Sequence, residues 1–294
     1  MVLKMPLLQI KVKVQLFTMN NIPLIIMAAG VSSRMKLSKS NNNLSEDQIK
    51  QSNSKAKGFI EVGKKNETII YHIIKNSVFA GINEFYIILS QDSEKFQNYL
   101  NKIAKELSVV IKFAFQDFYG NPKPLGTADA IFQTMNQFPE LKKFRFLICN
   151  SDNLYSTKAI KTLKEEYLYN SMIAYDFKCL DFKEEKLSSF SILEINNNFL
   201  SKIIEKPDIE TLETYYREKF VSMNIFSFIG EQVYKYLGNC EINEERGEKE
   251  IATAIQNMIS DGRGSVKVFK ICEHVPDLTS KDDIIVINKF LDKN

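Results

Sequence analysis

Short apolar runs alternate with longer segments of helical periodicity over the first 170 residues. The apolar runs, which have the length of buried strands, are residues 24–28, 85–89, 111–115 and 144–149. Helical spacing is found in residues 69–80, 93–107, 128–137 and 157–167. Strands that alternate with helices predict a mostly parallel sheet covered by helices on both faces, an α/β fold of three layers. In such sheets, ligands bind beyond the carboxyl ends of the strands.

The pattern changes after about residue 170. Strands with few helices between them are predicted for residues 172–177, 190–195, 200–205 and 221–228. Asn196, Asn197 and Asn198 predict a turn between the second and third of these strands. We expect this half to add strands to the same sheet and to form a second wall over the ligand. Residues 19–294 are therefore expected to form a single domain of two halves, about 19–170 and 171–294.

Two further segments stand outside this pattern. In residues 1–18, lysines interrupt the apolar residues, no small-residue cleavage site follows, and Met19 directly precedes the first strand. We interpret this segment as an extra N-terminal arm or an over-long gene start. Residues 36–56 form a polar insertion rich in Ser, Asn, Lys and Gln. We expect it to be exposed and mobile, with a plain surface loop and a lid over substrate equally supported.

Composition excludes several classes of function. The chain has 39 basic and 36 acidic residues, mixed along its length, so it has no basic face for nucleic acid. No apolar run has the length needed to span a bilayer. The 4 cysteines form no CxxC pair, which argues against a zinc site or a disulfide framework and favours a reduced cytoplasm. Both histidines, His72 and His274, are expected to be structural.

The first predicted strand runs into the string Ala28-Ala-Gly-Val-Ser-Ser-Arg34. Small residues at Ala28, Ala29 and Gly30 let the backbone turn sharply and let a phosphate approach its N–H groups. Arg34 then offers a planar fork of donors to phosphate oxygens. The string therefore predicts a phosphate-binding loop, although a tight turn followed by a surface arginine would have the same letters.

This loop resembles the hallmark of the sugar-phosphate nucleotidyltransferases, also called nucleoside diphosphate-sugar pyrophosphorylases. The resemblance implies that Ser32 and Ser33 also contact the nucleotide and that a lysine follows, which would be Lys57 in Lys57-Gly-Phe-Ile-Glu-Val-Gly63. Ala56 stands where the family has proline, and the polar insertion lengthens the interval. Lys55 is a weaker rival for the role.

Two more strings match the same family. Pro124-Leu-Gly-Thr-Ala-Asp-Ala-Ile131 is similar to a motif in which Gly126 and Thr127 would lie against the nucleobase, with Gln116 as a weaker candidate for the base. A helix start capped by Thr127 is the alternative. Leu147-Ile-Cys-Asn-Ser-Asp-Asn-Leu-Tyr155 places Asp152 at the end of a strand, where it would hold Mg²⁺. Ser151 replaces the glycine that is usual there.

The second half carries the strings that would bind the acceptor. Ile203-Ile-Glu-Lys-Pro207 resembles the family motif in which Glu205 would bond sugar hydroxyls and Lys206 would pair with the acceptor phosphate. Ser222 would lie near the sugar, while Asn224 and Ser191 replace sugar-facing glycines and so leave the acceptor open. Val275-Pro-Asp-Leu-Thr-Ser-Lys-Asp-Asp-Ile284 resembles the last motif, with Asp277 as the second metal ligand.

The resemblance covers residues 21–292 and implies the Rossmann-like fold of that family, with a nucleotide-binding half and an acceptor-binding half. The implied reaction joins a nucleoside triphosphate to a sugar 1-phosphate with Mg²⁺ and releases pyrophosphate, with Arg34, Lys57 and Asp152 as catalytic residues. The alternatives are a cytidylyltransferase for an acceptor such as phosphocholine, a related glycosyltransferase, and a non-catalytic nucleotide-sugar sensor. Nucleic acid and membrane are not expected as partners, and a homo-oligomer stays open.

Overall fold

The structure is a computed structural model, and it describes residues 22–39, 44–91, 93–208, 210–211, 220–262 and 264–293. The arm predicted for residues 1–18 lies outside them. Among these residues, no helix is both long enough and apolar enough to cross a membrane.

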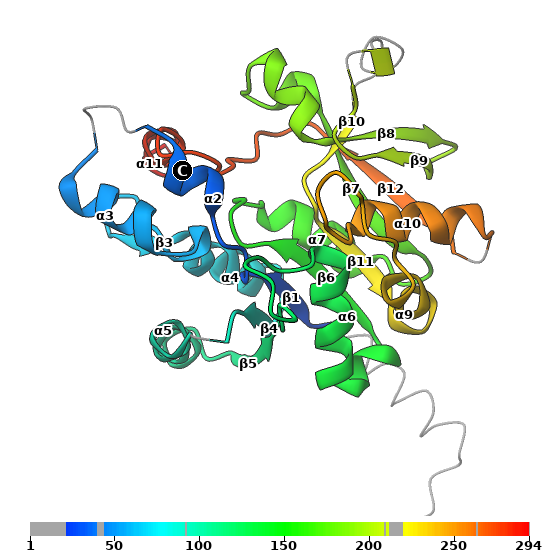
Figure 1. The fold of residues 1–294 in the computed structure, drawn as a ribbon, viewed down its shortest axis with the longest axis horizontal. Helices are drawn as coiled ribbons and strands as arrows, with labels where there is room; N and C mark the ends of the chain where they lie inside the picture. The colour runs from blue at the N-terminus through cyan, green and yellow to red at the C-terminus, as the bar shows by residue number, and fades with distance from the viewer. Residues whose placement is uncertain are drawn as a thin grey trace, which may run out of the picture.

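One mixed sheet of 10 strands runs through the molecule (Figure 1). Its strands are β1 (Leu24–Met27), β4 (Glu84–Leu89), β5 (Val110–Phe115), β6 (Arg145–Asn150), β7 (Asn170–Asp176), β8 (Ser191–Asn196), β9 (Phe199–Ile204), β10 (Phe220–Ser222), β11 (Phe226–Ile229) and β12 (Val266–Ile271). They are arranged in the order β10-β8-β9-β12-β7-β11-β6-β1-β4-β5. A separate hairpin joins β2 (Glu61–Val62) and β3 (Glu67–Thr68).

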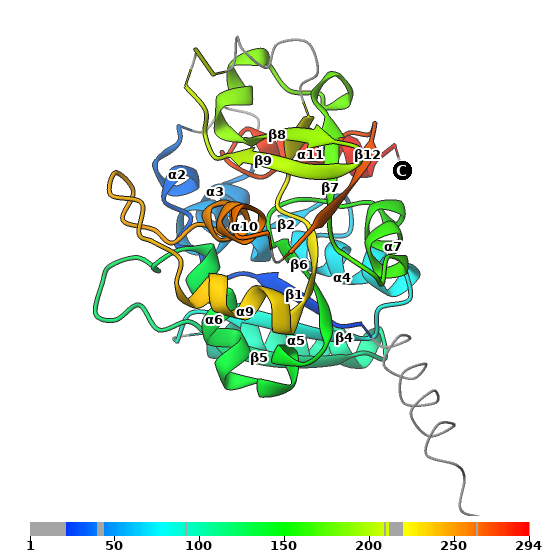
Figure 2. The same cartoon turned by 90° about the vertical axis from the view of Figure 1, so that its right-hand side faces the viewer.

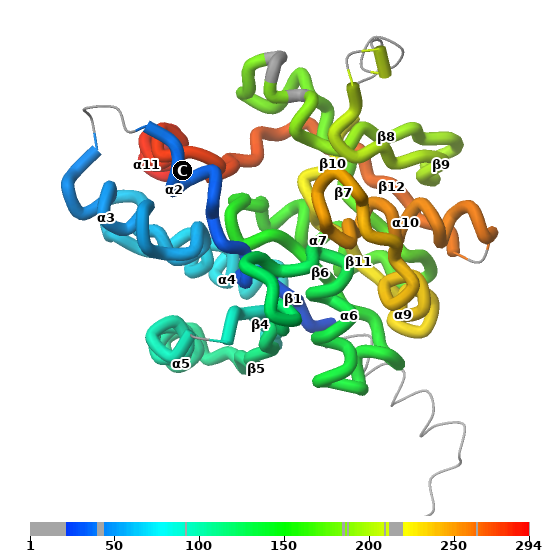
Figure 3. The backbone as a smooth tube through the Cα atoms, viewed as in Figure 1, coloured from blue at the N-terminus to red at the C-terminus, as the bar shows by residue number. Residues whose placement is uncertain are grey.

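The path of the chain through this sheet creates a place for a ligand. From β1 the chain goes to β4 and then β5 on one side, and it crosses back to β6 on the other side of β1 (Figure 3). All of these neighbours are parallel. Because the direction of winding reverses between β1 and β6, the loops that leave their carboxyl ends diverge and open a crevice.

Helices cover both faces of the sheet. They are α2 (Ser33–Leu37), α3 (Glu46–Ser54), α4 (Ile69–Phe79), α5 (Glu94–Glu106), α6 (Thr127–Gln137), α7 (Thr157–Glu165), α9 (Gly230–Gly238), α10 (Ile251–Ser260) and α11 (Asp283–Leu291). Figure 2 shows α6, α9 and α10 on one side of the sheet and α4 and α7 on the other. Alternate residues of β1 face two separate cores, because Leu24 and Ile26 pack with α4 and α7 while Ile25 packs with α6 and α10. The predicted three-layer α/β fold is confirmed.

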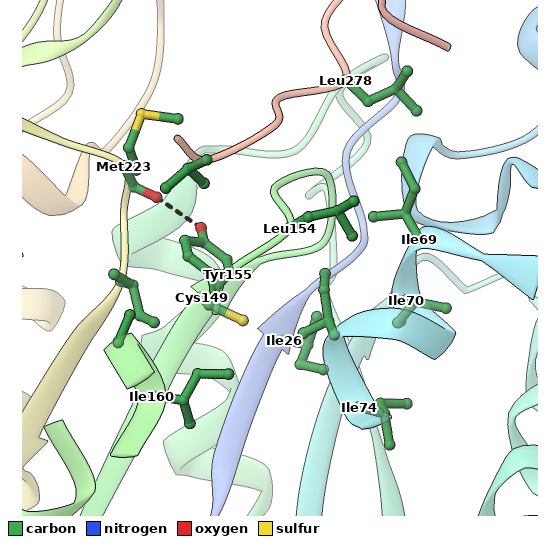
Figure 4. Close-up of a cluster of buried hydrophobic side chains, with 14 of the residues drawn as sticks. Ile26, Ile69, Ile70, Ile74, Cys149, Leu154, Tyr155, Ile160, Met223 and Leu278 are labelled. Atoms are coloured by element: carbon green, nitrogen blue, oxygen red, sulfur yellow. Dashed lines mark hydrogen bonds between the residues drawn. The ribbon is translucent and has the colours of Figure 1, made fainter. Parts of the chain in front are cut away.

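The core beneath the crevice is tied together by a buried tyrosine (Figure 4). Tyr155 lies next to Cys149 of β6 and is fully buried. Its hydroxyl donates to the carbonyl oxygen of Met223 at 2.7 Å, and Met223 belongs to the segment between β10 and β11. A buried hydroxyl needs such a partner, so this bond holds the two halves of the protein together directly below the loops that leave β6.

The sequence predictions differ in quality between the halves. The four strands and four helices predicted before residue 170 are confirmed to within a few residues. The second half departs further from the sequence analysis, because α9, α10, β12 and α11 lie after residue 228, where no helix or strand was predicted. The strand predicted for residues 221–228 is two strands, since Asn224 interrupts it with a left-handed φ of 54°. The predicted asparagine turn is confirmed, with Asn197 and Asn198 also at positive φ.

The polar insertion is folded in its second part. Helix α3 begins with a capping box, in which the Ser45 side chain accepts from the backbone N–H of Gln48 and the Gln48 side chain accepts from that of Ser45. Gln51 and Ser52 of this helix are buried. The expectation of an exposed insertion is therefore wrong for these two residues, its mobility stays a prediction, and residues 40–43 lie outside the described residues.

The cysteine prediction is also wrong for one pair. Cys179 and Cys272 form a disulfide across a sequence separation of 93 residues. They follow β7 and β12, which run parallel with Tyr175 beside Ile271, so the ends of these two strands bring the sulfur atoms together. Cys149 and Cys240 are free and buried. The argument from cysteine spacing for a reduced cytoplasm no longer holds.

Candidate functional site

The loop that the sequence predicts to bind phosphate leaves β1 at the crevice. The N–H of Ala28 still donates to the carbonyl oxygen of Ile88 in β4 at 2.9 Å, and the chain then turns away from the sheet. Ser32 has a left-handed φ of 58°, and a side chain added at Gly30 would meet no atom within 4 Å. The loop is therefore open on the side where a phosphate would approach its N–H groups.

Lys57 reaches this loop from beyond the insertion. Its backbone N–H donates to Oγ of Ser32 at 3.1 Å, so the loop and the lysine are held together although 25 residues separate them. Its ammonium lies 2.9 Å from Oδ2 of Asp152, and its side chain is only 11% exposed. The rival, Lys55, instead pairs with Glu61 at 3.2 Å and lines a different cavity. The structure thus places Lys57, and not Lys55, in the crevice.

Asp152 and Asp277 lie on two loops that are joined backbone to backbone. The N–H of Leu278 donates to the carbonyl oxygen of Asp152 at 2.9 Å, and that of Leu154 donates to Pro276 at 3.0 Å. Between them, Nδ2 of Asn153 donates to Oδ1 of Asp277 at 3.1 Å. The two carboxylates predicted to hold a metal are therefore positioned by one small ladder, even though they lie far apart in the sequence.

The carboxylate of Asp277 is enclosed by donors and a cation. Thr279 donates its hydroxyl to Oδ2 at 2.6 Å, and the ammonium of Lys186 lies 2.8 Å from the same oxygen. Burial raises the pKa of Asp277, but the charge and hydrogen bond of Lys186 outweigh burial and hold this pKa below its usual value. Asp277 is therefore ionised at neutral pH, as a metal ligand must be.

These residues fit a small, hard cation. Asp152 and Asp277 both line one cavity, and the ammonium groups of Lys57 and Lys186 show that each carboxylate attracts a cation there. Within the described parts of the chain, no group of three or more His, Cys, Asp or Glu side chains could hold a metal ion. Two carboxylates suit Mg²⁺, which commonly takes one or two of them and fills its other positions with water and phosphate oxygens.

The motif predicted to face the base forms the far wall of the crevice. Gly126 has a φ of 112°, and a side chain added to it would come within 2.5 Å of the carbonyl oxygen of Lys249. Thr127 accepts from the N–H of Ile251 at 3.0 Å through its hydroxyl, so it ties α6 to α10 instead of capping its own helix. Gln116 donates its amide to Gly126 and Asp129, which leaves its oxygen for a ligand.

Two adjoining cavities contain every predicted site residue. The larger, of about 730 Å³, is lined by all the predicted nucleotide residues: Ala28, Ala29, Gly30, Ser32, Ser33, Arg34, Lys57, Gln116, Gly126, Thr127 and Asp152. The smaller, of about 220 Å³, is lined by Ser191, Glu205, Lys206, Ser222, Asn224 and Asp277. Arg34, Thr127, Asp152 and Lys206 line both. We call these the nucleotide cavity and the acceptor cavity.

Asn224 and Ser191, which stand where the family has glycine, both line the acceptor cavity. Asn224 has a φ of 54°, and asparagine tolerates this left-handed conformation better than most residues do. Its N–H donates to Oγ of Ser222 at 3.1 Å. Ser191 donates its hydroxyl to Glu205, so it orients a carboxylate that lines the same cavity. The cavity is thus narrower and more polar than glycines would make it.

Several residues in or beside the two cavities escaped the sequence analysis. Lys186 contacts Asp277, Asn150 lies between the cavities and bonds Asn153, and Glu248 and Glu250 come from the loop before α10. The string Glu248-Lys-Glu250 directly before a helix was a usable signal for the two glutamates. Lys186 had none, because its position depends on how a segment of 3-10 helix (Glu184–Ser189) folds over the sheet.

The chain is similar in sequence to a known family and to known proteins. A family described as "Nucleotidyl transferase" matches residues 51–294. Among curated proteins, the chain is similar to the bifunctional protein GlmU of Staphylococcus saprophyticus subsp. saprophyticus, with 23% identity over 83% of this chain and 47% of that protein. It is also similar to a bifunctional sugar-1-phosphate nucleotidylyltransferase/acetyltransferase of Sulfurisphaera tokodaii, with 26% identity over 81% of this chain and 50% of that protein. The chain spans about half the length of these relatives.

Solved structures share the fold. A UDP-glucose pyrophosphorylase complexed with UDP-glucose aligns with a TM-score of 0.69 and 13% identity, over 93% of this chain and 99% of that one. A putative glucose-1-phosphate thymidylyltransferase from Bacillus anthracis, in complex with a sucrose, aligns with a TM-score of 0.65 and 17% identity, over 92% and 94%. Because the family match takes in most of the chain, this protein belongs to the nucleotidyl transferase family.

Proposed function

We propose that this protein is a sugar-phosphate nucleotidyltransferase, which joins a nucleoside triphosphate to a sugar 1-phosphate and releases pyrophosphate. The observation that carries the proposal is the arrangement at the border of the two cavities. There, Arg34, Lys57 and Asp152 face the crevice between β1 and β6, and Arg34, Asp152 and Lys206 line both cavities. This is the arrangement needed to bring an anionic acceptor against the α-phosphate of a bound nucleotide.

The nucleotide cavity suits a triphosphate. The open turn at Gly30 presents backbone N–H groups, and Arg34 is exposed at its edge, free of any ion pair among the described residues. Lys57 lies on the other side of the loop. Two cations and a row of N–H groups neutralise the charge that builds up on a departing pyrophosphate. The rigid backbone at Gly126 and the free oxygen of Gln116 would face the base.

Asp152 and Asp277 would hold Mg²⁺, which when bound lowers the charge on the phosphate oxygens that it contacts. The chain itself supplies position and charge. Lys206 would pair with the acceptor phosphate from the acceptor cavity, and Glu205, aligned by Ser191, would accept from hydroxyl groups of the acceptor.

The reaction needs no strong general base. A sugar 1-phosphate is already anionic, so one of its oxygens can attack the α-phosphorus in line while the bond to pyrophosphate breaks. What the protein must supply is alignment of the two phosphates and neutralisation of their charges. The histidines are consistent with this account, because neither lines the nucleotide cavity or the acceptor cavity.

A phosphorylated alcohol that carries an amine, such as phosphocholine, is the second candidate acceptor. Three glutamates, Glu205, Glu248 and Glu250, line the acceptor cavity together with the ring of Phe190. Burial, and after it the neighbouring charge of Glu205, raises the pKa of Glu250. Carboxylates and an aromatic face are the groups that bind ammonium ions.

Substitution of Asp152 tests the proposal. Asp152→Asn keeps the shape of the side chain but removes its charge, so pyrophosphate release should fall by a factor of about 10² or more while the protein stays folded. Asp261→Asn serves as the matched control, because Asp261 pairs with Lys235 on the surface and lines neither cavity. Near-normal release by Asp152→Asn would sink the proposal.

Two other functions predict different results in the same assay. A glycosyltransferase would transfer sugar from a nucleotide sugar and release no pyrophosphate from a triphosphate. A sensor would bind a nucleotide sugar without turnover. The sequence leaves a homo-oligomer open, and the mass of the protein in solution, measured by light scattering, tests this separately.

A further inference from the structure

Lys186 is a cation that no sequence motif predicted, and it is built into the acceptor end of the site. It lies on the 3-10 segment Glu184–Ser189, and its ammonium is 2.8 Å from Oδ2 of Asp277. The same ammonium lies 4.1 Å from the centroid of the Phe182 ring and 6.0 Å from that of Phe190. The lysine is therefore held between two aromatic faces and a carboxylate, and its side chain is only 23% exposed.

The other directions around Asp277 are already filled. Asn153 donates to Oδ1 and Thr279 donates to Oδ2, and the carboxylate side chain is 10% exposed. A divalent cation that binds this carboxylate needs one of its oxygens. Because the two neutral donors are fixed by the paired loops of Asp152 and Asp277, the lysine on the separate 3-10 segment is the partner that has to give way.

A disulfide links the two segments that carry the lysine and the aspartate. Cys179 and Cys272 form the disulfide, and Lys186 lies seven residues after the first cysteine while Asp277 lies five residues after the second. The two segments thus leave one covalent junction and meet again at the ion pair. A short closed loop of this kind restricts how far the ammonium can move from the carboxylate.

We propose that Lys186 is a positioning residue that occupies Asp277 in the substrate-free protein and competes with a divalent cation for it, with the Cys179–Cys272 bond keeping the lysine in place. This inference rests on the proposed function, because it takes Asp277 as a metal ligand. Lys57 makes a similar contact with Asp152, but Lys57 is already part of the proposed pyrophosphate site. The ammonium of Lys186, in contrast, contacts the aspartate and the two rings.

The test measures metal binding without nucleotide or acceptor. Mn²⁺ is added to the full chain, and free Mn²⁺ is measured by electron paramagnetic resonance. Lys186→Gln removes the competing charge and should bind Mn²⁺ about tenfold more tightly than the unchanged protein, whereas Lys186→Arg should stay close to it. Lys183→Gln is the matched control, because Lys183 is exposed directly before the same segment and should leave the affinity unchanged.

Two results would overturn the proposal. One is a Lys186→Gln variant that binds Mn²⁺ as weakly as the unchanged protein or more weakly, provided that thermal melting shows both to be folded. The other is the absence of Mn²⁺ binding in every variant, which would remove Asp277 as a metal ligand. Pyrophosphate release is measured in parallel, so a failure of the proposed function is seen independently of a failure of the competition.

The disulfide is tested by the same readout. Replacing both Cys179 and Cys272 by serine should shift Mn²⁺ affinity toward the value of Lys186→Gln, and adding the serine pair to Lys186→Gln should change nothing further. If the variant with both serines does not fold, Cys272→Ser alone is measured instead, because Cys272 is the exposed end of the disulfide. A serine variant that binds Mn²⁺ like the unchanged protein would contradict the part assigned to the disulfide.

Discussion

The ammonium of Lys57 lies 2.9 Å from Oδ2 of Asp152, and 95 positions of sequence separate the two residues. The lysine follows the polar insertion and the aspartate ends β6, so neither neighbourhood in sequence points to the other. The contact joins the proposed pyrophosphate site to the proposed metal site. The contact can be tested by mutation with a control close by, because Lys55, two residues before Lys57, lies in a different environment.

Lys57→Ala should lower pyrophosphate release by a factor of about 10² or more, because it removes a cation from the place where negative charge develops. Lys55→Ala is the matched control. It removes a partly exposed ion pair with Glu61, which is worth about 0–1 kcal/mol of stability, and should leave turnover within about twofold. Steady-state kinetics of both variants decide the matter. If both variants lost turnover equally, the insertion, and not the position of Lys57, would control activity.

Gly30→Ala separates binding from folding. An added methyl group at Gly30 would meet no protein atom within 4 Å, so the melting temperature should stay unchanged. The same methyl group would stand where a phosphate approaches the loop, so the affinity for nucleoside triphosphate should fall at least about tenfold. Titration calorimetry measures the affinity. Unchanged binding of the triphosphate by a folded Gly30→Ala variant would place the phosphates elsewhere.

Asn224→Gly addresses the acceptor. The residue already has a φ of 54°, which glycine adopts freely, so the substitution should not lower stability. It removes a side chain from the wall of the acceptor cavity, and we expect the KM for hexose 1-phosphates to fall relative to that for smaller acceptors. A panel of phosphorylated acceptors measures the ratio. If the ratio does not change, Asn224 does not limit the size of the acceptor.

The first half of the fold was predictable because its strands are continuous apolar runs with clear helices between them. The helices after residue 228 were not predicted, and two of them, α10 and α11, have sequences rich in β-branched residues. Helix α11, with the sequence Asp-Ile-Ile-Val-Ile-Asn-Lys-Phe-Leu, would pass as a buried strand, and it is helical because Ile284 and Ile287 pack one face against the core. At these positions, packing against the core outweighs the β-strand propensity of the residues.

The residues of the site also divide into some that the sequence predicted and some that it did not. The residues that belong to recognisable sequence motifs were predicted, and the structure brings them to two adjoining cavities. Lys186 and the Cys179–Cys272 bond were missed, because both depend on strands β7 and β12 lying side by side. No spacing within the sequence encodes that pairing, which forms only when the second half of the sheet is assembled.

The histidines predict how stability depends on pH. Burial lowers the pKa values of His72 and His274 below their usual value near 6.5, against the opposing charges of Glu67 and Asp181 respectively. The unfolded chain therefore binds protons more readily than the folded one, and the free energy of unfolding should fall as pH decreases below about 6.5. Above pH 7 both histidines are neutral and have no effect.

A variant with both His72→Gln and His274→Gln tests this dependence. Chemical denaturation between pH 5 and 7.5 should show a smaller loss of stability on acidification in the variant than in the unchanged protein. The chain has only 2 histidines, so the comparison removes all of them and leaves the carboxylates as they were. Parallel curves for the two proteins would contradict the lowered pKa values.

The central claim is tested most directly by measuring pyrophosphate after the pure protein is mixed with Mg²⁺, each common nucleoside triphosphate and a panel of sugar 1-phosphates. The account predicts that pyrophosphate appears with at least one pair of substrates, that it requires both of them, and that a nucleoside diphosphate sugar forms in equal amount. Release of pyrophosphate without an acceptor, or no release with any pair although the folded protein binds the triphosphate, would contradict it.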